Sequence, residues 1–394
     1  MSSSSGSTKR CGRIFVAGAI AAHPIGGGGN TWAFLQYVLG LRRLGFEVFY
    51  VEELPPQGCF DEKWRRVPFA SSYNARYVQQ VMQEFGFADH AGIWPAENPN
   101  EGVGLSFRTL SAIARTADAI VNLSGRMHRA EILAGPAKRI YIDLDPGFTQ
   151  IWQEGYGVNM NLQGHESHFT VGLCVGTPQC PVPTCSIRWH PTLPPVVLDA
   201  WATNLPPGST YTTVADWRGY SPVQWQGTWY GQKSEEFLRV LSLPRSAPAA
   251  LELCLAIHPE EPDLPRLREA GWRIVDPRQC AATPAAYRDY IQSSRGEFTV
   301  VKNGYRVGHT GWFSDRSACY LAAGRPAVVQ ETGFSSALPT GSGLLSFVNL
   351  EEACQALRMV EARYEQHAAS ARELAREYFD SDRVLQRLLQ TAGV

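Results

Sequence analysis

The sequence predicts an α/β protein built from two Rossmann-like domains in series. At 394 residues, the chain is long for one hydrophobic core and suits two domains of ordinary size. Apolar runs of strand length alternate with segments of helical periodicity in both halves. Between the halves, residues 175–230 are rich in proline, tryptophan, threonine and glycine, a composition typical of loops and linkers.

The N-terminal half begins with a strand, a glycine-rich loop, a helix and a second strand. The strands are predicted at residues 13–20 and 47–51, and the helix between them at residues 31–44. This order and spacing are typical of a parallel βαβ crossover. Lys9 and Arg10 before the first apolar run would also suit a secretion signal, but the glycines and the helix that follow favour a buried strand.

Later segments continue the alternation. Strands are predicted at residues 119–123, 139–145, 251–257, 272–275 and 297–301, and helices at 110–117, 234–243, 263–270, 284–293 and 351–389, the last with a break at 378–381. The division that we expect is a disordered tail at 1–10, an N-terminal domain at 11–206, a C-terminal domain at 207–375, and a C-terminal helix at 376–394 that packs back on the N-terminal domain.

Composition excludes several classes of partner. The formal net charge of −1 gives no electrostatic reason to expect nucleic acid or an anionic membrane. No run approaches the 18 apolar residues that would suggest a membrane span. The nine cysteines are scattered and odd in number, which predicts free thiols and a cytoplasmic protein. The sequence is silent on oligomeric state and leaves a homodimer open.

Four consecutive glycines, residues 26–29, connect the first strand to the first helix. They let the chain turn sharply and let a ligand approach the amide groups at the helix start, so Gly28, Gly29 and Asn30 are predicted to lie near an acceptor. A purely structural turn is the alternative, since the dinucleotide spacing G-x-G-x-x-G is absent. His23, just before the loop, is a candidate catalytic base or else a structural histidine.

Asp143 and Asp145 end a predicted strand. At i and i+2 they would share one face of the strand, so both could reach one cation. The alternatives are a solvated carboxylate beside a turn-capping one, or a role for Asp145 as a base that orients an acceptor. His165 and His168 are also close in sequence, but no third ligand is evident beside them, and we predict no metal site.

The segment GWFSDRSACYLAAGRPAVVQETG, residues 311–333, carries the densest group of candidate residues. Ser314 is predicted to cap a helix whose first N–H groups face an anion. Positive charge for a diphosphate would come from Arg316, Lys302 and, after a separate glycine-rich turn, Lys233. The predicted donor-binding set is Lys233, Lys302, His309, Gly311, Trp312, Ser314, Arg316, Gln330, Glu331, Thr332 and Gly333. An ordinary strand crossover is the alternative.

Two stretches of the chain resemble nucleotide-sugar glycosyltransferases of the GT-B architecture. Residues 26–53 are similar to the glycine loop, helix and R-G-H-E-V strand that open such enzymes, with LGFEV at residues 44–48. Residues 315–353 are similar to the donor-site run E-A-(L/M)-A-C-G-x-P-V and the strand after it. The likeness is strongest to retaining and spore-maturation-type bacterial families. It implies two domains that face each other across a cleft, with C-terminal helices.

The resemblance also implies an activity: transfer of a sugar from a nucleoside-diphosphate sugar to a small-molecule or glycan acceptor, without metal or cofactor, in bacterial secondary metabolism or glycan biosynthesis. It places diphosphate and sugar contacts on Gly311, Ser314, Arg316, Glu331, Thr332 and Gly333. The family glutamate of the donor helix falls on Cys319, and the family histidine of the first loop falls on Asn30. His23 or Asp145 would then be the base of an inverting enzyme, whereas a retaining enzyme would need none.

Three other functions fit parts of the pattern. A nucleotide-sugar 2-epimerase shares the two-domain layout but would need a pair of carboxylates around the sugar. An NAD-dependent oxidoreductase is disfavoured by the broken glycine fingerprint. A non-catalytic carbohydrate-binding homologue agrees with the loss of the glutamate at Cys319.

Overall fold

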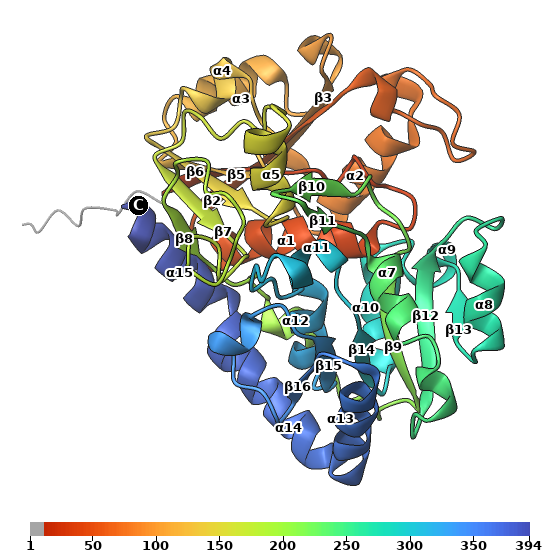
Figure 1. Cartoon of the computed structure of the whole chain (residues 1–394). Helices are drawn as coiled ribbons and strands as arrows, with labels where there is room; N and C mark the ends of the chain where they lie inside the picture. Colours follow the sequence, from red (N-terminus) through yellow and green to blue (C-terminus); the bar gives the residue numbers. More distant parts are fainter. Residues whose placement is uncertain (1–11) are drawn as a thin grey trace, which may run out of the picture.

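The computed structural model describes residues 12–394 and places a β-sheet at the centre of each half of the chain (Figure 1). The expected tail at residues 1–10 lies outside the described residues. The first sheet has eight strands in the order β4-β3-β2-β1-β5-β6-β7-β8, parallel except for β4. Its strands are β1 (Arg13–Ala17), β2 (Glu47–Leu54), β3 (Ala91–Pro95), β4 (Val103–Gly104), β5 (Ala119–Leu123), β6 (Lys138–Asp143), β7 (Ser167–Thr170) and β8 (Trp189–Pro191).

The second sheet has six parallel strands in the order β13-β12-β9-β14-β15-β16. Its strands are β9 (Thr210–Asp216), β12 (Ala250–Ala256), β13 (Arg273–Val275), β14 (Gly296–Thr299), β15 (Ala327–Gln330) and β16 (Leu344–Phe347). A separate hairpin pairs β10 (Val223–Trp225) with β11 (Thr228–Tyr230). Numbered in chain order, the parallel strands of the second sheet follow the Rossmann arrangement 3-2-1-4-5-6, and those of the first sheet follow it with one more strand, 3-2-1-4-5-6-7. Such sheets bind ligands at the point where the strand order reverses.

Helices cover the sheets. In the N-terminal half they are α1 (Gly28–Arg43), α2 (Tyr73–Glu84), α3 (Phe107–Ala114), α4 (Ala130–Leu133), α5 (Phe148–Gly155) and α6 (Leu198–Trp201). In the C-terminal half they are α7 (Lys233–Arg239), α8 (Asp263–Glu269), α9 (Pro277–Cys280), α10 (Pro284–Ser293), α11 (Asn303–Val307), α12 (Asp315–Ala322), α13 (Leu350–Ala362), α14 (Tyr364–Leu374) and α15 (Ser381–Ala392).

The central strands are apolar on both faces because helices cover both sides of each sheet. In β1, Ile14 and Val16 belong to one buried apolar cluster, whereas Phe15 and Ala17 belong to another. This alternation follows from the two-residue period of a strand. It also explains why the sequence shows β1 as a continuous apolar run.

Strand β9 corrects the prediction that residues 175–230 are all loop and linker. It is the central strand of the second sheet, although its sequence is TYTTVAD. The buried hydroxyl of Thr212 lies 2.6 Å from the hydroxyls of both Ser294 and Tyr320, and Thr213 donates to Thr299. Because these hydrogen bonds satisfy buried threonines, a polar composition is compatible with a core strand.

The two halves share a large apolar interface. One buried cluster joins Phe148 and Val175 of the N-terminal half to Tyr230 and Tyr305 of the C-terminal half. Helix α1 packs against α10 and α12 of the other half, and Figure 1 shows it at the junction between the sheets. Interfaces of this kind restrict relative domain motion.

The C-terminal helix α15 packs against α1. A Cβ atom built on Gly40 of α1 would lie 2.5 Å from a methyl carbon of Leu385, so glycine permits the close approach of these two helices. The helical segment predicted at residues 351–389 is interrupted at Arg363 and again at Asp380, the latter within the predicted break.

The expectation of free thiols is wrong for two cysteines. Cys254 of β12 and Cys280 of α9 form a disulfide, with their Cα atoms 6.8 Å apart. They are 26 residues apart in sequence, and the fold brings them together at one edge of the second sheet. Six other cysteines of the described chain are free.

Candidate functional site

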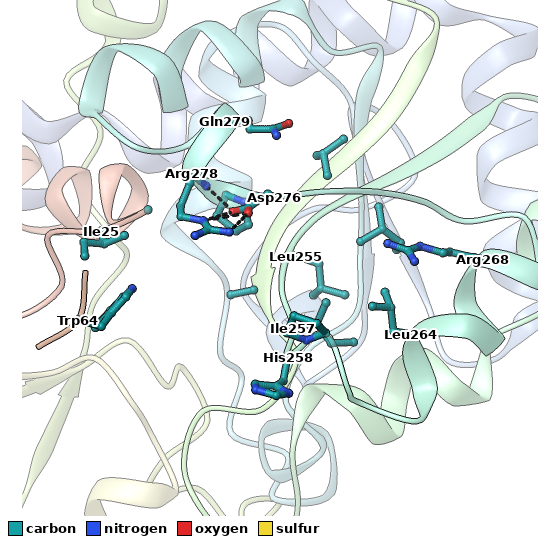
Figure 2. Close-up of a pocket in the computed structure, with 16 residues that line it drawn as sticks. Ile25, Trp64, Leu255, Ile257, His258, Leu264, Arg268, Asp276, Arg278 and Gln279 are labelled. Carbon is teal, nitrogen blue, oxygen red and sulfur yellow. Dashed lines mark hydrogen bonds and ion pairs between the residues drawn. The ribbon is translucent and has the colours of Figure 1, made fainter. Parts of the chain in front are cut away.

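The larger of two main cavities lies over the carboxyl ends of β12 and β13, between the two domains. Its volume is about 730 Å³. Apolar walls come from Leu255, Ile257, Ile274 and Val275, whereas the N-terminal domain contributes Ile25, Gly26 and Trp64 (Figure 2). Concave, largely apolar cavities at this edge of an α/β sheet are typical ligand sites.

Polar groups border this cavity. Asp276 caps α9 and forms an ion pair with Arg278, so these two charges offset each other (Figure 2). The Nδ1 atom of His258 accepts a hydrogen bond from the Glu260 backbone, which leaves Nε2 to face outward as a donor. Arg268 also lines the cavity and has no ion pair within residues 12–394.

Lys233 begins α7 and lies near the end of β9, the reversal point of the second sheet. Burial lowers the pKa of Lys233 to about 7, and the neighbouring charges of Arg316 and Lys302 also lower it, whereas Asp216 and Glu297 oppose the shift. Its side chain has no hydrogen bond or ion pair in the described part of the chain. A bound anion would offset this concentration of positive charge.

Arg316 is not the mobile cation that the sequence predicted. Its guanidinium donates to Glu297 at 2.6 Å, to Thr299 at 2.9 Å and to the Val214 carbonyl at 2.8 Å. Only 8% of Arg316 is exposed, and the Glu297 side chain is fully buried. The ion pair of Arg316 and Glu297 therefore links β9, β14 and α12 inside the protein, beneath the edge of the sheet.

Lys302 and Asp145 form an ion pair between the domains. The Lys302 Nζ atom lies 3.2 Å from both carboxylate oxygens of Asp145. Tyr220 donates to the same carboxylate at 2.5 Å, and Tyr305 also donates to it. Asp145 is thus a restrained anion with little freedom to act as a base, and Lys302 is not free for a diphosphate in this state.

The Asp143 carboxylate lies inside the protein and accepts a hydrogen bond from the Asp145 backbone N–H at 3.0 Å. It is fully buried and accepts hydrogen bonds from Thr149, Gln150 and Thr170. Burial raises the pKa of the Asp143 carboxyl, and these donors oppose the shift. The two aspartates therefore do not converge on one cation, and residues 12–394 contain no cluster of three or more metal-ligating side chains.

The start of α12 is capped as predicted, but by the protein alone. The Ser314 hydroxyl accepts from the Arg316 backbone at 3.2 Å, and Ser314 is buried. Asp315 in the first turn places a carboxylate where an anion would otherwise bind, and burial raises its pKa. This end of α12 leaves little space or charge for a diphosphate.

The loop after β15 is held by its own glutamate. Glu331 accepts hydrogen bonds from the backbone of Thr332 and Gly333, and the Thr332 carbonyl accepts from Gly311. Gln330 is 1% exposed and donates to Glu236, so it is a core residue rather than a sugar contact.

Two further predicted donor residues, Trp312 and His309, lie around this loop. Trp312 stacks on Tyr305, with ring centroids 4.4 Å apart. His309 is exposed, and its Nδ1 atom would lie 3.5 Å from a Cβ atom built on Gly333. Among the residues predicted for this loop, His309 is exposed, whereas Trp312, Glu331 and Gly333 are partly buried.

The glycine loop approaches the second domain rather than an open ligand site. Gly28 donates its N–H to the Ala281 carbonyl, and an added Cβ atom would lie 2.3 Å from the Thr283 carbonyl oxygen. The corresponding space at Gly29 is filled by the Tyr287 ring, and Asn30 donates to the Ala19 carbonyl. In this arrangement the glycines allow close packing of the two domains, and the acceptor role of Gly28, Gly29 and Asn30 stays a prediction.

We expect Gly28→Ala to lower the free energy of unfolding by about 1–3 kcal/mol, because the new methyl group overlaps the Thr283 backbone. The control is Ala22→Gly, in the loop before the glycines. Gly45→Ala is unsuitable as a control because Gly45 has a φ of 90°, a conformation in which a side chain is strained. Chemical denaturation measures the free energy of unfolding of both variants. Unchanged stability of Gly28→Ala would show that the domains separate easily.

His23 lies on the loop between β1 and α1 and retains exposed surface. Desolvation lowers the pKa of His23, as does the nearby Arg126, whereas Asp216 of the other domain opposes the shift. The imidazole is therefore neutral near pH 7 and able to accept a proton. Among the candidate bases, it has fewer constraints than Asp145.

A second cavity of about 580 Å³ lies over the carboxyl ends of β5 and β6 in the N-terminal domain. Its wall includes Arg126, Asp145 and Trp152. Ser124 and Gly125 both have positive φ, and Asn161 donates to the Gly125 carbonyl, so the loop is held in an unusual conformation. Arg126 and Trp152 are not among the predicted site residues, although the sequence Ser-Gly-Arg directly follows the predicted strand at 119–123 and so indicates this sheet edge.

No family model and no curated protein matches the chain. Solved structures with similar folds include an α-glucosyltransferase in complex with UDP and DNA, with 10% identity, a TM-score of 0.59 and coverage of 97% of this chain and 99% of that one. HepE of Anabaena in complex with UDP and glucose has 10% identity, a TM-score of 0.58 and the same coverage. AviGT4, a glycosyltransferase involved in avilamycin A biosynthesis, has 13% identity, a TM-score of 0.53 and 96% coverage of both chains.

These matches span nearly the whole chain, so both domains and their arrangement are compared together. The protein has the GT-B fold, two Rossmann-like domains that face each other, as the sequence resemblance predicted. No helix within residues 12–394 has the length and apolarity to cross a membrane.

Proposed function

We propose that the protein is a glycosyltransferase that moves a sugar from a nucleoside-diphosphate sugar to a small-molecule or glycan acceptor. The observation that carries the proposal is Lys233, a cation without a protein partner at the reversal point of the second sheet. The cavity over β12 and β13 at the same sheet edge has the size and apolar walls that suit a nucleoside. Similar folds bound to UDP support this assignment.

In the proposed complex, the nucleoside occupies the cavity over β12 and β13, the diphosphate lies against Lys233, and the acceptor enters the cavity beside Trp152. The acceptor hydroxyl oxygen forms a bond to the anomeric carbon of the sugar. The bond from that carbon to the diphosphate oxygen breaks, and its electron pair leaves with the diphosphate. Lys233 stabilises the departing charge, so we propose a transfer that needs no metal or cofactor.

Neutral His23 can take the proton of the acceptor hydroxyl if the reaction inverts the anomeric centre. Fixing both substrates at the domain junction supplies much of the remaining acceleration.

The net charge of −1 favours a small molecule or glycan over nucleic acid as acceptor, even though one similar structure contains DNA. Six free cysteines favour a cytoplasmic location, against which the Cys254–Cys280 disulfide argues.

Calorimetric titration with UDP, TDP, GDP, ADP and NAD tests the proposal. We expect one nucleoside diphosphate to bind, and Lys233→Met to weaken it by roughly tenfold or more at pH 7, since a charge-assisted contact is lost. Lys138→Met, at the amino end of β6, is the matched control and should bind as wild type does. Binding of NAD alone, or of no nucleotide, would contradict the proposed function.

A further inference from the structure

Trp64 is a large aromatic side chain that the N-terminal domain holds over the cavity of the C-terminal domain. It is 57% exposed, although burial of such a ring would normally be favourable. Within residues 12–394, its ring contacts the ring of Phe60, at a centroid distance of 5.6 Å and an interplanar angle of 58°. Figure 2 shows Trp64 and Ile25 on one side of the cavity, with Ile257 and His258 on the other.

Residues 60–66, which carry Trp64, form a short hairpin held together by hydrogen bonds and an ion pair. Phe60 and Arg66 form an antiparallel bridge, and Trp64 lies at the tip with a positive φ of 60°. The Asp61 carboxylate accepts hydrogen bonds from the backbone of Lys63 and Arg65 and forms an ion pair with the Arg65 side chain. A non-glycine residue held at positive φ by such bonds is often fixed for a function.

The chemistry around the ring fits a flat, polar aromatic ligand. Most of the cavity wall beyond Trp64 is aliphatic, with Ile257, Ile274 and Val275. His258 and Gln279 at its border can donate to ring oxygens and nitrogens. A nucleobase has a π-face for the indole and hydrogen-bonding edges for such residues.

We propose that Trp64 stacks on the nucleobase of the donor nucleotide and so closes the cavity from the opposite domain. This inference rests on the proposed function, since it assigns the nucleoside to this cavity. Because Trp64 belongs to the first domain and β12 and β13 to the second, nucleotide binding contacts both domains at once. Trp64 is a positioning residue, distant from the reacting bond.

The test compares Trp64→Leu with Trp64→Phe and with Trp229→Leu. Trp229, on β11, is 60% exposed and does not line the cavity, so it is a matched control. We expect Trp64→Leu to weaken nucleoside-diphosphate binding by roughly 5- to 150-fold, the range measured for loss of one base–aromatic stack. Trp64→Phe should retain most of the affinity, and inorganic pyrophosphate should bind all variants equally.

Tryptophan fluorescence gives an independent readout. Stacking should quench part of the emission of the wild type and of Trp229→Leu when nucleotide is added, and Trp64→Leu should lose that change. Equal nucleotide affinity in wild type and Trp64→Leu would overturn the stacking role and leave the proposed function standing. Equal losses of nucleotide and pyrophosphate binding would overturn it as well, whereas failure of the wild type to bind any nucleotide would overturn both.

Discussion

Arg316→Met is expected to lower the free energy of unfolding by about 3–5 kcal/mol, the cost of leaving a buried charge unpaired. The substitution removes the partner of Glu297, whose side chain is fully buried between the sheet and α12. It also removes the hydrogen bonds that the guanidinium donates to Thr299 and to the Val214 carbonyl. Urea denaturation followed by circular dichroism measures the loss.

Two further variants separate this effect from a general loss of charge. Arg376→Met breaks an exposed ion pair with Glu373 and should cost no more than about 1 kcal/mol. The double variant Arg316→Met, Glu297→Leu removes both buried charges and should recover part of the stability. If Arg316→Met folded normally but lost nucleotide binding, the original prediction of a diphosphate contact would be right after all.

Much of the fold could be predicted because burial on both faces leaves long apolar runs in the sequence. Strand β5 and helix α10 have the predicted bounds, since each coincides with a compact apolar pattern and clear end signals. Strand β9 was missed because its threonines are satisfied by partners 82 and 108 residues away in the sequence. Hydrogen bonds between residues so far apart in the sequence leave no pattern near β9 from which the strand could be predicted.

The candidate site was harder to predict than the fold, because the same residue type serves ligands and packing equally well. The glycine loop has the composition of a ligand cradle, but its free space is taken by Thr283 and Tyr287 of the other domain. Arg316 lies in a motif for donor binding, but only the structure shows Glu297 beneath it. Lys233 differs from Arg316 because no carboxylate of the described chain pairs with it.

Nucleotide affinity is expected to fall as the pH rises from 7 to 9, by up to about tenfold per pH unit. The ordinary pKa of a lysine is 10.5, and that of Lys233 is lowered to about 7. Above pH 7 the free protein therefore holds a neutral amine, and a diphosphate must bind together with a proton. The second pKa of a phosphate is about 6, so the ligand keeps its charge over this range.

The same pKa shift acts on folding with the opposite sign. Between pH 7 and 10.5 the unfolded chain holds the Lys233 proton and the folded chain does not, so this group raises the stability of the free protein as pH rises. Opposite trends in stability and affinity would identify a desolvated lysine at the anion site, because general alkaline damage would lower both.

Titrations in buffers of different ionisation enthalpy should show uptake of about one proton per nucleotide at pH 8. Lys233→Arg keeps its charge and should give a flat profile, and an equal slope in this variant would assign the titration to another group.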